Sequence, residues 1–506
     1  MIISVLKQHK KYKAIRFLSM ALVLFIYSFQ SSAQELGLDR FMHSVLKNNP
    51  GVQKILAEKE VAEGALEANL GIDDAELASS LSLSRSEPDK IFGSEPSTSE
   101  NKNLNLSYNR LFSDSGTRLS LGYNNIYTDR SPASVYSGSQ YYQPSFTVRL
   151  TQPLLKNAGG IQDSLNIKLS QIDYRLSKLS SQENLESYIT QLASLYVDWY
   201  LASQELKISE DVYKRAIAQE KLTQTKVKRQ VSEPYELLRA QEIREDYFSR
   251  LQQAKGRFIG LSHQINAQMN ANKTLTENTL IPLNPKNSVL LSDSKNMIRQ
   301  SDYLEGGSRL KSILDSLNQQ QLILLEAKDN AKSSDLNLNV GYTRHGLNED
   351  LSDAHNSSLN KDDYSVMLEY KYLLGNRKAI GNLQSQTAKK RQIEADTQQR
   401  LIDAKATLAN LKIQSSQLKK AIKSVDRKIS IEQKKLKKEQ HLYRIGKLDL
   451  FELLKDQTSH LESRLNRERL YTQQLTLQLK IGELLDHNLE SINLQLKSDT
   501  NKVIEE

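Results

Sequence analysis

The chain has 506 residues, no cysteine and a formal net charge of +9. Five of its Lys and Arg residues, and none of its Asp or Glu, lie in residues 1–33, so the rest of the chain carries a net charge of only +4. Without a strong charge or a patch of basic and aromatic residues, the composition gives no case for nucleic-acid binding. The absence of cysteine excludes disulfides, so stability has to come from packing or assembly.

Residues 1–33 are predicted to be a signal peptide. Lys7 opens a basic segment that ends at Arg16, and the apolar segment Phe17–Phe29 that follows is too short to span a bilayer comfortably. Ser31-Ser32-Ala33 then offers a cleavage site of small residues, which would make Gln34 the first residue of the mature chain. A retained anchor helix is the alternative. On the first interpretation the protein is exported.

The next region predicts one helix and then strands. Residues 38–70 are amphipathic with a break at Asn49-Pro50, which predicts an interrupted helix. Beyond it, apolar and polar residues alternate in six segments, 81–84, 104–109, 119–124, 146–151, 336–343 and 364–372. A period of two gives a strand one apolar and one polar face, and the apolar face meets another sheet in a soluble sandwich or lipid in a membrane barrel. The chain has 22 tyrosines, and tyrosine recurs in these segments, which favours lipid.

Very long helices are predicted between and after the strands. Neither Gly nor Pro occurs between Gly160 and Pro234 or between Gly381 and Gly446, and a further clear run ends at Gly482. Read as helices, the first two stretches are about 110 Å and about 100 Å long at 1.5 Å per residue. Apolar residues in 401–436 keep a seven-residue spacing, which is typical of a coiled coil. Trp199 is interpreted as a packing anchor within the first long helix.

The chain contains two internal repeats, each made of a helix, strands and a long helical hairpin. The turn segment Arg229–Leu238 of the first repeat resembles Arg444–Leu454 of the second. The predicted division is a signal peptide 1–33, a first repeat 34–271, a linker 272–300, a second repeat 301–490 and a polar tail 491–506.

The first repeat is longer than the second among its strands. The offset between matching positions is 258 residues at Val52 and Leu310 but 219 at Leu154 and Leu373. An extra hairpin centred on Asp114-Ser115-Gly116 would account for most of the difference. Two options are open: the hairpin decorates the outside of the molecule, or it adds strands to the sheet.

Three motifs carry a resemblance to a known family. They are Asn49-Pro50 in the first helix, Gln152-Pro153-Leu154-Leu155 at the end of the first set of strands, and Tyr443-Arg444-Ile445-Gly446 followed by Phe451-Glu452-Leu453-Leu454. In this order and at these spacings, nearly all of the mature chain resembles the TolC family of outer-membrane efflux proteins.

The resemblance implies a homotrimer that is mainly α with membrane β. The long helical hairpins of three chains would form a periplasmic α-barrel, joined to a shared β-barrel in the lipid of the cell outer membrane. The implied function is the exit duct of a tripartite efflux or type I secretion system, which conducts cargo passively. Its implied partners are a periplasmic adaptor protein and an inner-membrane pump of the RND, ABC or MFS type. No enzymatic activity and no cofactor are implied.

The resemblance also implies a pore gate just after the second turn. Glu452 matches an inward-facing acidic residue of the family, and Glu236 holds the equivalent place in the first repeat. The next acidic position of the family is Lys455 here, with Asp456 shifted by one residue, so the second acidic ring is in doubt. Three converging carboxylates would attract cations and raise one another's pKa. The alternative is that Glu452 only opposes the dipole of its helix.

The turns also supply candidate contacts with partners. Tyr443 matches a tyrosine that the family uses in hydrogen bonds between turns, but the family's partner arginine falls at Leu448, for which Lys447 is the expected substitute. Gly446 suits a chain reversal with positive φ, and Gln230 is its counterpart in the first repeat. The expected adaptor-docking residues are Arg229, Val231, Arg444, Gly446 and Lys447. Solvated helix-end cations are the alternative interpretation.

Two other classes of function are open at this point. One is a structural coiled-coil protein of the envelope with a soluble β head. The other is a periplasmic adaptor, although adaptors have one hairpin and two full repeats argue against it. No metal-ligand spacing, phosphate loop or nucleophile motif occurs, so no catalytic or metal site is predicted. The sequence does not distinguish drug, metal and polypeptide cargo.

Overall fold

The structure is a computed structural model that describes residues 34–87, 98–134, 138–269, 280–292, 303–356 and 361–492. The predicted signal peptide and most of the predicted linker and tail lie outside these residues. The chain divides into two compact units. The strand unit consists of Leu56–Ser181 and Leu310–Leu401, and the hairpin unit consists of Met1–Ile55, Gln182–Arg309 and Ile402–Glu506. These units divide the chain differently from the two repeats, whose boundaries stay a prediction.

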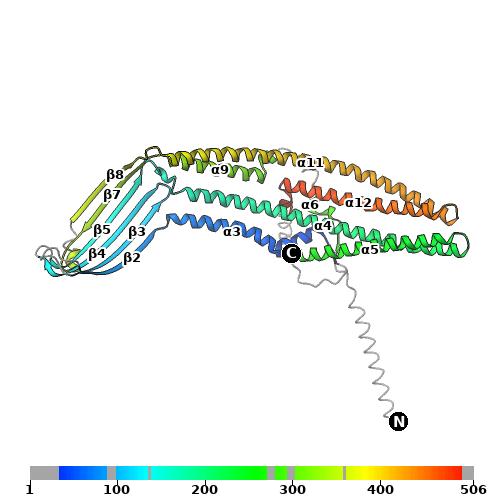
Figure 1. The fold of residues 1–506 in the computed structure, drawn as a ribbon, viewed down its shortest axis with the longest axis horizontal. Coiled ribbons are helices and arrows are strands. Elements are labelled where there is room, and N and C mark those ends of the chain that lie inside the picture. The colour runs from blue at the N-terminus through cyan, green and yellow to red at the C-terminus, as the bar shows by residue number, and fades with distance from the viewer. Residues whose placement is uncertain are drawn as a thin grey trace, which may run out of the picture. The chain divides into compact units, whose positions relative to one another are not determined.

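An antiparallel sheet of six strands forms the strand unit (Figure 1). Its strands are β2 (Glu76–Ser86), β3 (Thr98–Phe112), β4 (Thr117–Ser134), β5 (Gly138–Pro153), β7 (Asp335–His345) and β8 (Lys361–Lys371), in the order β2-β3-β4-β5-β7-β8. Five of the six alternating segments lie within these strands, and the sixth, 364–372, extends one residue beyond the end of β8. The pairing of β5 with β7 joins the strands of the first repeat to those of the second.

The predicted extra hairpin is part of this sheet. The turn at Asp114-Ser115-Gly116 joins β3 to β4, which pair along their length, and Gly116 has a φ of 73°. The first repeat therefore contributes four strands and the second contributes two. The hairpin is thus part of the sheet of this chain, and its place in a barrel stays a prediction.

The sheet has one apolar and one polar face. Apolar residues lie opposite apolar residues from strand to strand, for example Leu81 opposite Leu104 and Val340 opposite Val366. Polar residues likewise match across the other face, where the hydroxyl oxygens of Thr147 and Thr343 are 3.2 Å apart. The apolar face is open at both edges of the sheet, since Leu81 is 69% exposed and Val366 is 74% exposed.

A tight joint connects the sheet to the first long helix. After β5 the chain passes through the 3-10 turn Ala158–Gly160 into α4 (Leu165–Lys228). Gly160 has a φ of 64°, and a Cβ atom at this position would lie 1.7 Å from the carbonyl oxygen of Ser113, so only glycine fits. Gln152 of the Gln-Pro motif donates from Nε2 to the carbonyl oxygen of Ser115, at 3.1 Å. The motif thus holds the β3–β4 turn against the strand end.

The remaining elements are helices and short segments. Those with residues in the strand unit are α3 (Pro50–Leu70), the 3-10 turn Gly71–Asp73, α9 (Arg309–Asn330), α10 (Leu351–Asn356) and α11 (Arg377–Arg444). Those of the hairpin unit are β1 (Gln34–Leu36), α2 (Leu38–Asn48), α5 (Pro234–Gln268), β6 (Leu280–Pro282), the 3-10 turn Pro285–Asn287, α6 (Val289–Ser292), α8 (Tyr303–Gly306) and α12 (Leu450–Leu484). Strands β1 and β6 pair in parallel. Within the described residues, no helix is both long enough and apolar enough to span a membrane.

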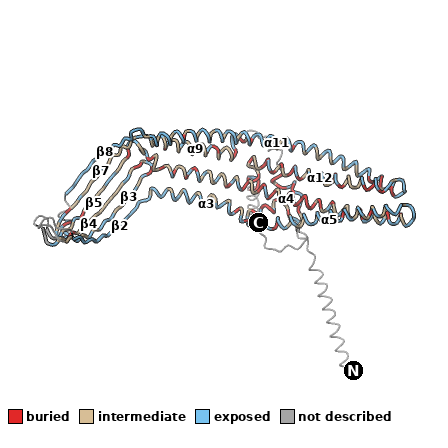
Figure 2. Tube along the Cα trace, viewed as in Figure 1, coloured by how far each residue is buried: buried red, intermediate tan, exposed pale blue. Residues whose placement is uncertain are grey.

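The main apolar core of the hairpin unit surrounds α4 (Figure 2). Tyr196 and Trp199 of α4 are fully buried there with Phe41 of α2. The indole Nε1 of Trp199 donates to Ser262 Oγ at 2.7 Å, and its ring stacks on Phe258. The interpretation of Trp199 as a packing anchor is confirmed. These contacts fix α2 and α5 against α4.

The helix break at Asn49-Pro50 also has a packing role. The side chain of Asn49 accepts from the amide of Gly51 at 2.7 Å, which caps the start of α3. Its Nδ2 donates to the carbonyl oxygen of Gln268 at 2.8 Å, at the end of α5. Along α11 the residues at seven-residue spacing are buried or partly buried, including Leu408, Ser415 and Leu436. The predicted coiled-coil face is therefore a packing face.

Candidate functional site

Two tight turns close the helical hairpins of the hairpin unit. The first turn (residues 229–233) joins α4 to α5, and the second turn (residues 445–449) joins α11 to α12. Gly446 has a φ of 76°, as predicted, and its counterpart Gln230 also passes through the left-handed region, with a φ of 58°. Pro234 begins α5, and Asp449 Oδ1 caps α12 by accepting from the amide of Phe451 at 3.1 Å.

A buried cluster connects α4 and α11 beside these turns. The hydroxyl of Tyr443 is 2.9 Å from Thr223 Oγ1. Lys226 Nζ lies 3.6 Å from the centre of the Tyr443 ring and donates to the Tyr443 carbonyl oxygen, which combines a cation–π contact with a helix-end hydrogen bond. Lys447, the expected substitute for the family's arginine, is exposed and has no partner among the described residues, so its role stays a prediction. Within this chain the lysine that contacts Tyr443 is Lys226.

Glu236 faces the same cluster. One of its carboxylate oxygens is buried and accepts no hydrogen bond from any described residue. Burial lowers the pKa of Lys226, whereas the nearby Glu236 carboxylate raises it. Sequence reasoning missed Lys226 because nothing local marks it: Thr223 and Lys226 share a helix face, but their partner is more than 200 residues away.

Glu452 differs from Asp456 in its surroundings. Glu452 is exposed in the first turn of α12, and no described residue pairs with it. Asp456 instead forms an ion pair with Lys435 of α11 and lies beside Glu439. Hydrogen bonding with Glu439 and Lys435 lowers the pKa of Asp456, while burial and Asp456 raise the pKa of Glu439. The carboxylate of Asp456 is therefore used in packing α11 against α12, whereas the carboxylate of Glu452 has no partner among the described residues.

The five expected docking residues are all exposed on the two turns. They are Arg229, Val231, Arg444, Gly446 and Lys447.

A further feature near the second turn is an excess of basic residues. Residues 411–447 hold twelve Lys and Arg against three Asp and Glu, whereas the rest of the chain after residue 33 holds 52 basic and 57 acidic residues. The excess positive charge of the mature chain is therefore concentrated in the second half of α11 and the turn that follows.

Part of this charge forms a stripe on one side of α11. Its members recur at helical spacing, are exposed and have no partner among the described residues: Lys419, Lys423, Arg427, Lys434 and Lys437. We call these five residues the basic stripe. At 1.5 Å per residue it is about 27 Å long. Summing the charges over successive stretches of the sequence would have revealed this excess of basic residues.

A buried ion-pair cluster fixes three chain segments of the hairpin unit together. Glu186 of α4 is fully buried and accepts from Arg309 Nη2 at 2.7 Å. It also accepts from the amides of Asn488 at 2.7 Å and Leu489 at 3.0 Å. Arg309 pairs in addition with Asp486, at 2.9 Å. Burial raises the pKa of Glu186 to about 7, although Arg309 and the two amides oppose the shift. The cluster is structural, and the described residues contain no group of three or more side chains suited to a metal ion.

Comparison with solved structures finds this fold in outer-membrane proteins. The transmembrane channel CusC matches with a TM-score of 0.65 and 14% identity, over 88% of this chain and 91% of that one. The outer membrane protein VceC of Vibrio cholerae matches with a TM-score of 0.63 and 12% identity, over 89% and 96%. For the CmeC outer membrane channel of Campylobacter jejuni the values are 0.60 and 13%, over 89% and 86%. No protein-family model matches the sequence, and no curated protein is similar to it.

At these identities the comparisons establish the fold. The chain has the fold of the TolC-type outer-membrane channels along almost its whole described length. The resemblance predicted from three short motifs is confirmed at this level.

The pKa of Glu186 predicts how its contribution to stability depends on pH. Because the pKa rises from 4.5 to about 7 on folding, the folded state binds the proton more tightly. The stability contributed by this proton is fully present below about pH 4.5 and is lost as the pH rises through about 7, a change of up to about 3 kcal/mol. We expect Glu186→Gln, which does not titrate, to lose less stability than the wild type between pH 5 and 8. Thermal unfolding at several pH values measures the difference, and parallel pH curves for the two proteins would contradict the prediction.

Proposed function

We propose that the protein is an outer-membrane channel that acts as a homotrimer and forms the passive exit duct of a tripartite efflux or type I secretion system. The observation that carries the proposal is a six-stranded sheet with one open apolar face and two open edges, in a chain that also forms two long helical hairpins. The fold shared with solved outer-membrane channels supports it. In this proposal the strands lie in the outer membrane and the hairpins lie in the periplasm.

The open apolar face supports a position in lipid. Leaving apolar surface in water costs about 25 cal/mol per Å², and soluble monomers rarely expose contiguous patches larger than a few hundred Å². The face extends across all six strands, from Leu77 and Leu81 on β2 to Val366 and Leu368 on β8. Hydrocarbon removes this cost without any further protein layer. The other face carries Ser, Thr, Asn and Gly, which suits a water-filled interior.

The two open edges support association of copies. In the described chain, β2 pairs only with β3 and β8 pairs only with β7, so each leaves backbone N–H and C=O groups without a strand partner. Each unsatisfied group costs several kcal/mol in hydrocarbon. Pairing β2 of one copy with β8 of the next would satisfy both edges and close a barrel from three copies.

The exposed turns and the basic stripe support docking of a partner. Three of the five turn residues are basic, and the basic stripe adds five unpaired cations on α11. A partner with an acidic surface would complement this charge. In the proposed assembly that partner is the periplasmic adaptor, which links the duct to an inner-membrane pump of the RND, ABC or MFS type.

The second turn supports a gate with a preference for cations. Glu452 is an exposed carboxylate with no partner in the described part of the chain, so in a trimer three such groups can face a common axis. Lys226 and Tyr443 hold the α4–α5 and α11–α12 hairpins of one chain together beside it. In this proposal Glu452 sets the charge of the constriction, and the buried contact of Lys226 with Tyr443 restrains its opening.

Two neighbouring residues of β8 test the orientation of the sheet. Leu368 lies on the apolar face and Met367 on the opposite face. Lysine on a lipid-facing position costs about 2–4 kcal/mol near the bilayer centre. We therefore expect Leu368→Lys to remove most of the protein from the outer-membrane fraction, whereas Met367→Lys is tolerated. Membrane fractionation and the yield of a heat-sensitive trimer in detergent provide the measurement. Equal effects of the two substitutions, or recovery of the wild type as a water-soluble periplasmic protein, would reject the proposal in favour of an envelope protein with a soluble β head.

The gate is tested by removing one charge per chain. We expect Glu452→Gln to move the reversal potential in a salt gradient toward zero in planar-bilayer recordings, because the constriction loses its negative ring. Glu242→Gln on α5 removes the same charge from an exposed position away from both turns and is the matched control. If Glu452→Gln leaves the reversal potential unchanged, Glu452 has no role in selectivity.

A further inference from the structure

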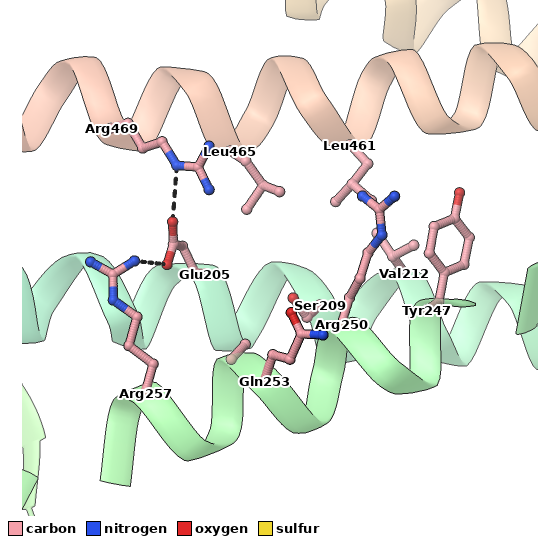
Figure 3. A pocket seen from close by; sticks show the side chains of 11 residues that line it. Glu205, Ser209, Val212, Tyr247, Arg250, Gln253, Arg257, Leu461, Leu465 and Arg469 are labelled. Atoms are coloured by element: carbon pink, nitrogen blue, oxygen red, sulfur yellow. Dashed lines mark hydrogen bonds and ion pairs between the residues drawn. The ribbon is translucent and has the colours of Figure 1, made fainter. Parts of the chain in front are cut away.

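A recess with both polar and apolar lining lies in the hairpin unit between α4, α5 and α12 (Figure 3). Its volume is about 380 Å³, and eleven residues line it. Three of them are arginines, namely Arg250 and Arg257 of α5 and Arg469 of α12. The only acidic side chain in the lining is Glu205 of α4. The recess is separate from the sheet and from the two turns to which the proposed function assigns roles.

Glu205 orders two of the arginines. It is 7% exposed, and its two carboxylate oxygens are both in use. One accepts from Arg257 Nη1 at 2.7 Å, and the other accepts from Arg469 Nε at 3.1 Å. Figure 3 shows the two guanidinium groups on either side of the carboxylate. Charge-assisted hydrogen bonds of this kind restrict two long side chains that otherwise sample many rotamers.

The arginines keep most of their donors free. A guanidinium has five N–H groups, and Glu205 uses one nitrogen of each of its two partners. The side chains of Arg257 and Arg469 are 47% and 61% exposed, so their remaining N–H groups are accessible from solvent. Arg250 pairs through Nε with Asp246 of its own helix at 3.0 Å, and its two terminal nitrogens have no partner among the described residues. In Figure 3 Arg250 extends from α5 toward α12. The recess therefore contains more hydrogen-bond donors than acceptors.

We propose that this recess is a binding site for an oxyanion, either a phosphate or a carboxylate group. The planar guanidinium fork matches the geometry of both groups and binds them through paired hydrogen bonds. Glu205 holds two forks in place before the ligand arrives, which lowers the entropy that binding has to overcome. The amide of Gln253 and the hydroxyl of Ser209 add further polar groups to the lining. Two sources supply this chemistry: a free anion, or an acidic side chain of a partner protein.

Titration of the purified, detergent-solubilised protein tests the site. The probes are inorganic phosphate and glutamate capped at both backbone ends, each added at constant ionic strength and followed by calorimetry. We expect Arg257→Gln combined with Arg469→Gln to weaken binding by at least about tenfold, because two charge-assisted contacts are lost. Arg215→Gln is the control, since it removes an exposed arginine of α4 outside the recess. It is expected to bind like the wild type.

A second variant keeps the test valid if the double variant fails to fold. Arg250→Gln leaves both contacts of Glu205 intact and removes only the third guanidinium, so we expect folding to be normal and binding to be about threefold to tenfold weaker. Preferential binding of phosphate identifies a free anion as the source, and equal binding of capped glutamate identifies an acidic side chain. Absence of binding of both probes to the wild type, or equal binding by Arg250→Gln and Arg215→Gln, overturns the proposal.

Discussion

The rest of the structure depends on one exposed surface, the apolar face of a six-stranded sheet. Each of its two edge strands has a single partner strand in the described part of the chain. A single copy in water cannot satisfy this surface, because apolar side chains stay exposed and edge backbone groups bond only to solvent. In the proposed assembly, lipid covers the apolar face, and strands of neighbouring copies pair with the edges.

The helical hairpins differ from the sheet, since most of their buried groups pack and form hydrogen bonds within a single chain. The Trp199 core, the Glu186 cluster and the Tyr443 cluster each join helices that are far apart in the sequence. Two of the clusters contain buried charges: Glu186 meets Arg309 and two backbone amides, and Lys226 meets the ring and the carbonyl oxygen of Tyr443. The exceptions to this internal pairing are the exposed cations of the basic stripe and the free N–H groups around Glu205. Those are the surfaces on which binding partners are proposed.

Local physics made much of the fold predictable from the sequence. Strict alternation located the strands, the absence of Gly and Pro located the long helices, and Gly446 marked a turn because its backbone needs a positive φ. Contacts between distant segments left no such signal. Lys226 and Tyr443 are 217 residues apart, and Glu186 and Arg309 are 123 apart. The contact of Lys226 with Tyr443 was missed because adjacency to the turn in the sequence does not show which helix packs against Tyr443.

The central claim is that β2 of one copy pairs with β8 of the next within the membrane. The chain contains no cysteine, so pairs of introduced cysteines report on this contact without background. Double variants that scan β2 and β8, beginning with Ser82→Cys and Ser365→Cys, can be oxidised in isolated outer membranes and separated in denaturing gels. The account predicts that the double variant at one register forms covalent dimers and trimers. A single-cysteine variant can link at most two chains, so it forms no covalent trimer. Protein that is present in the membrane but forms only monomers at every register would contradict it.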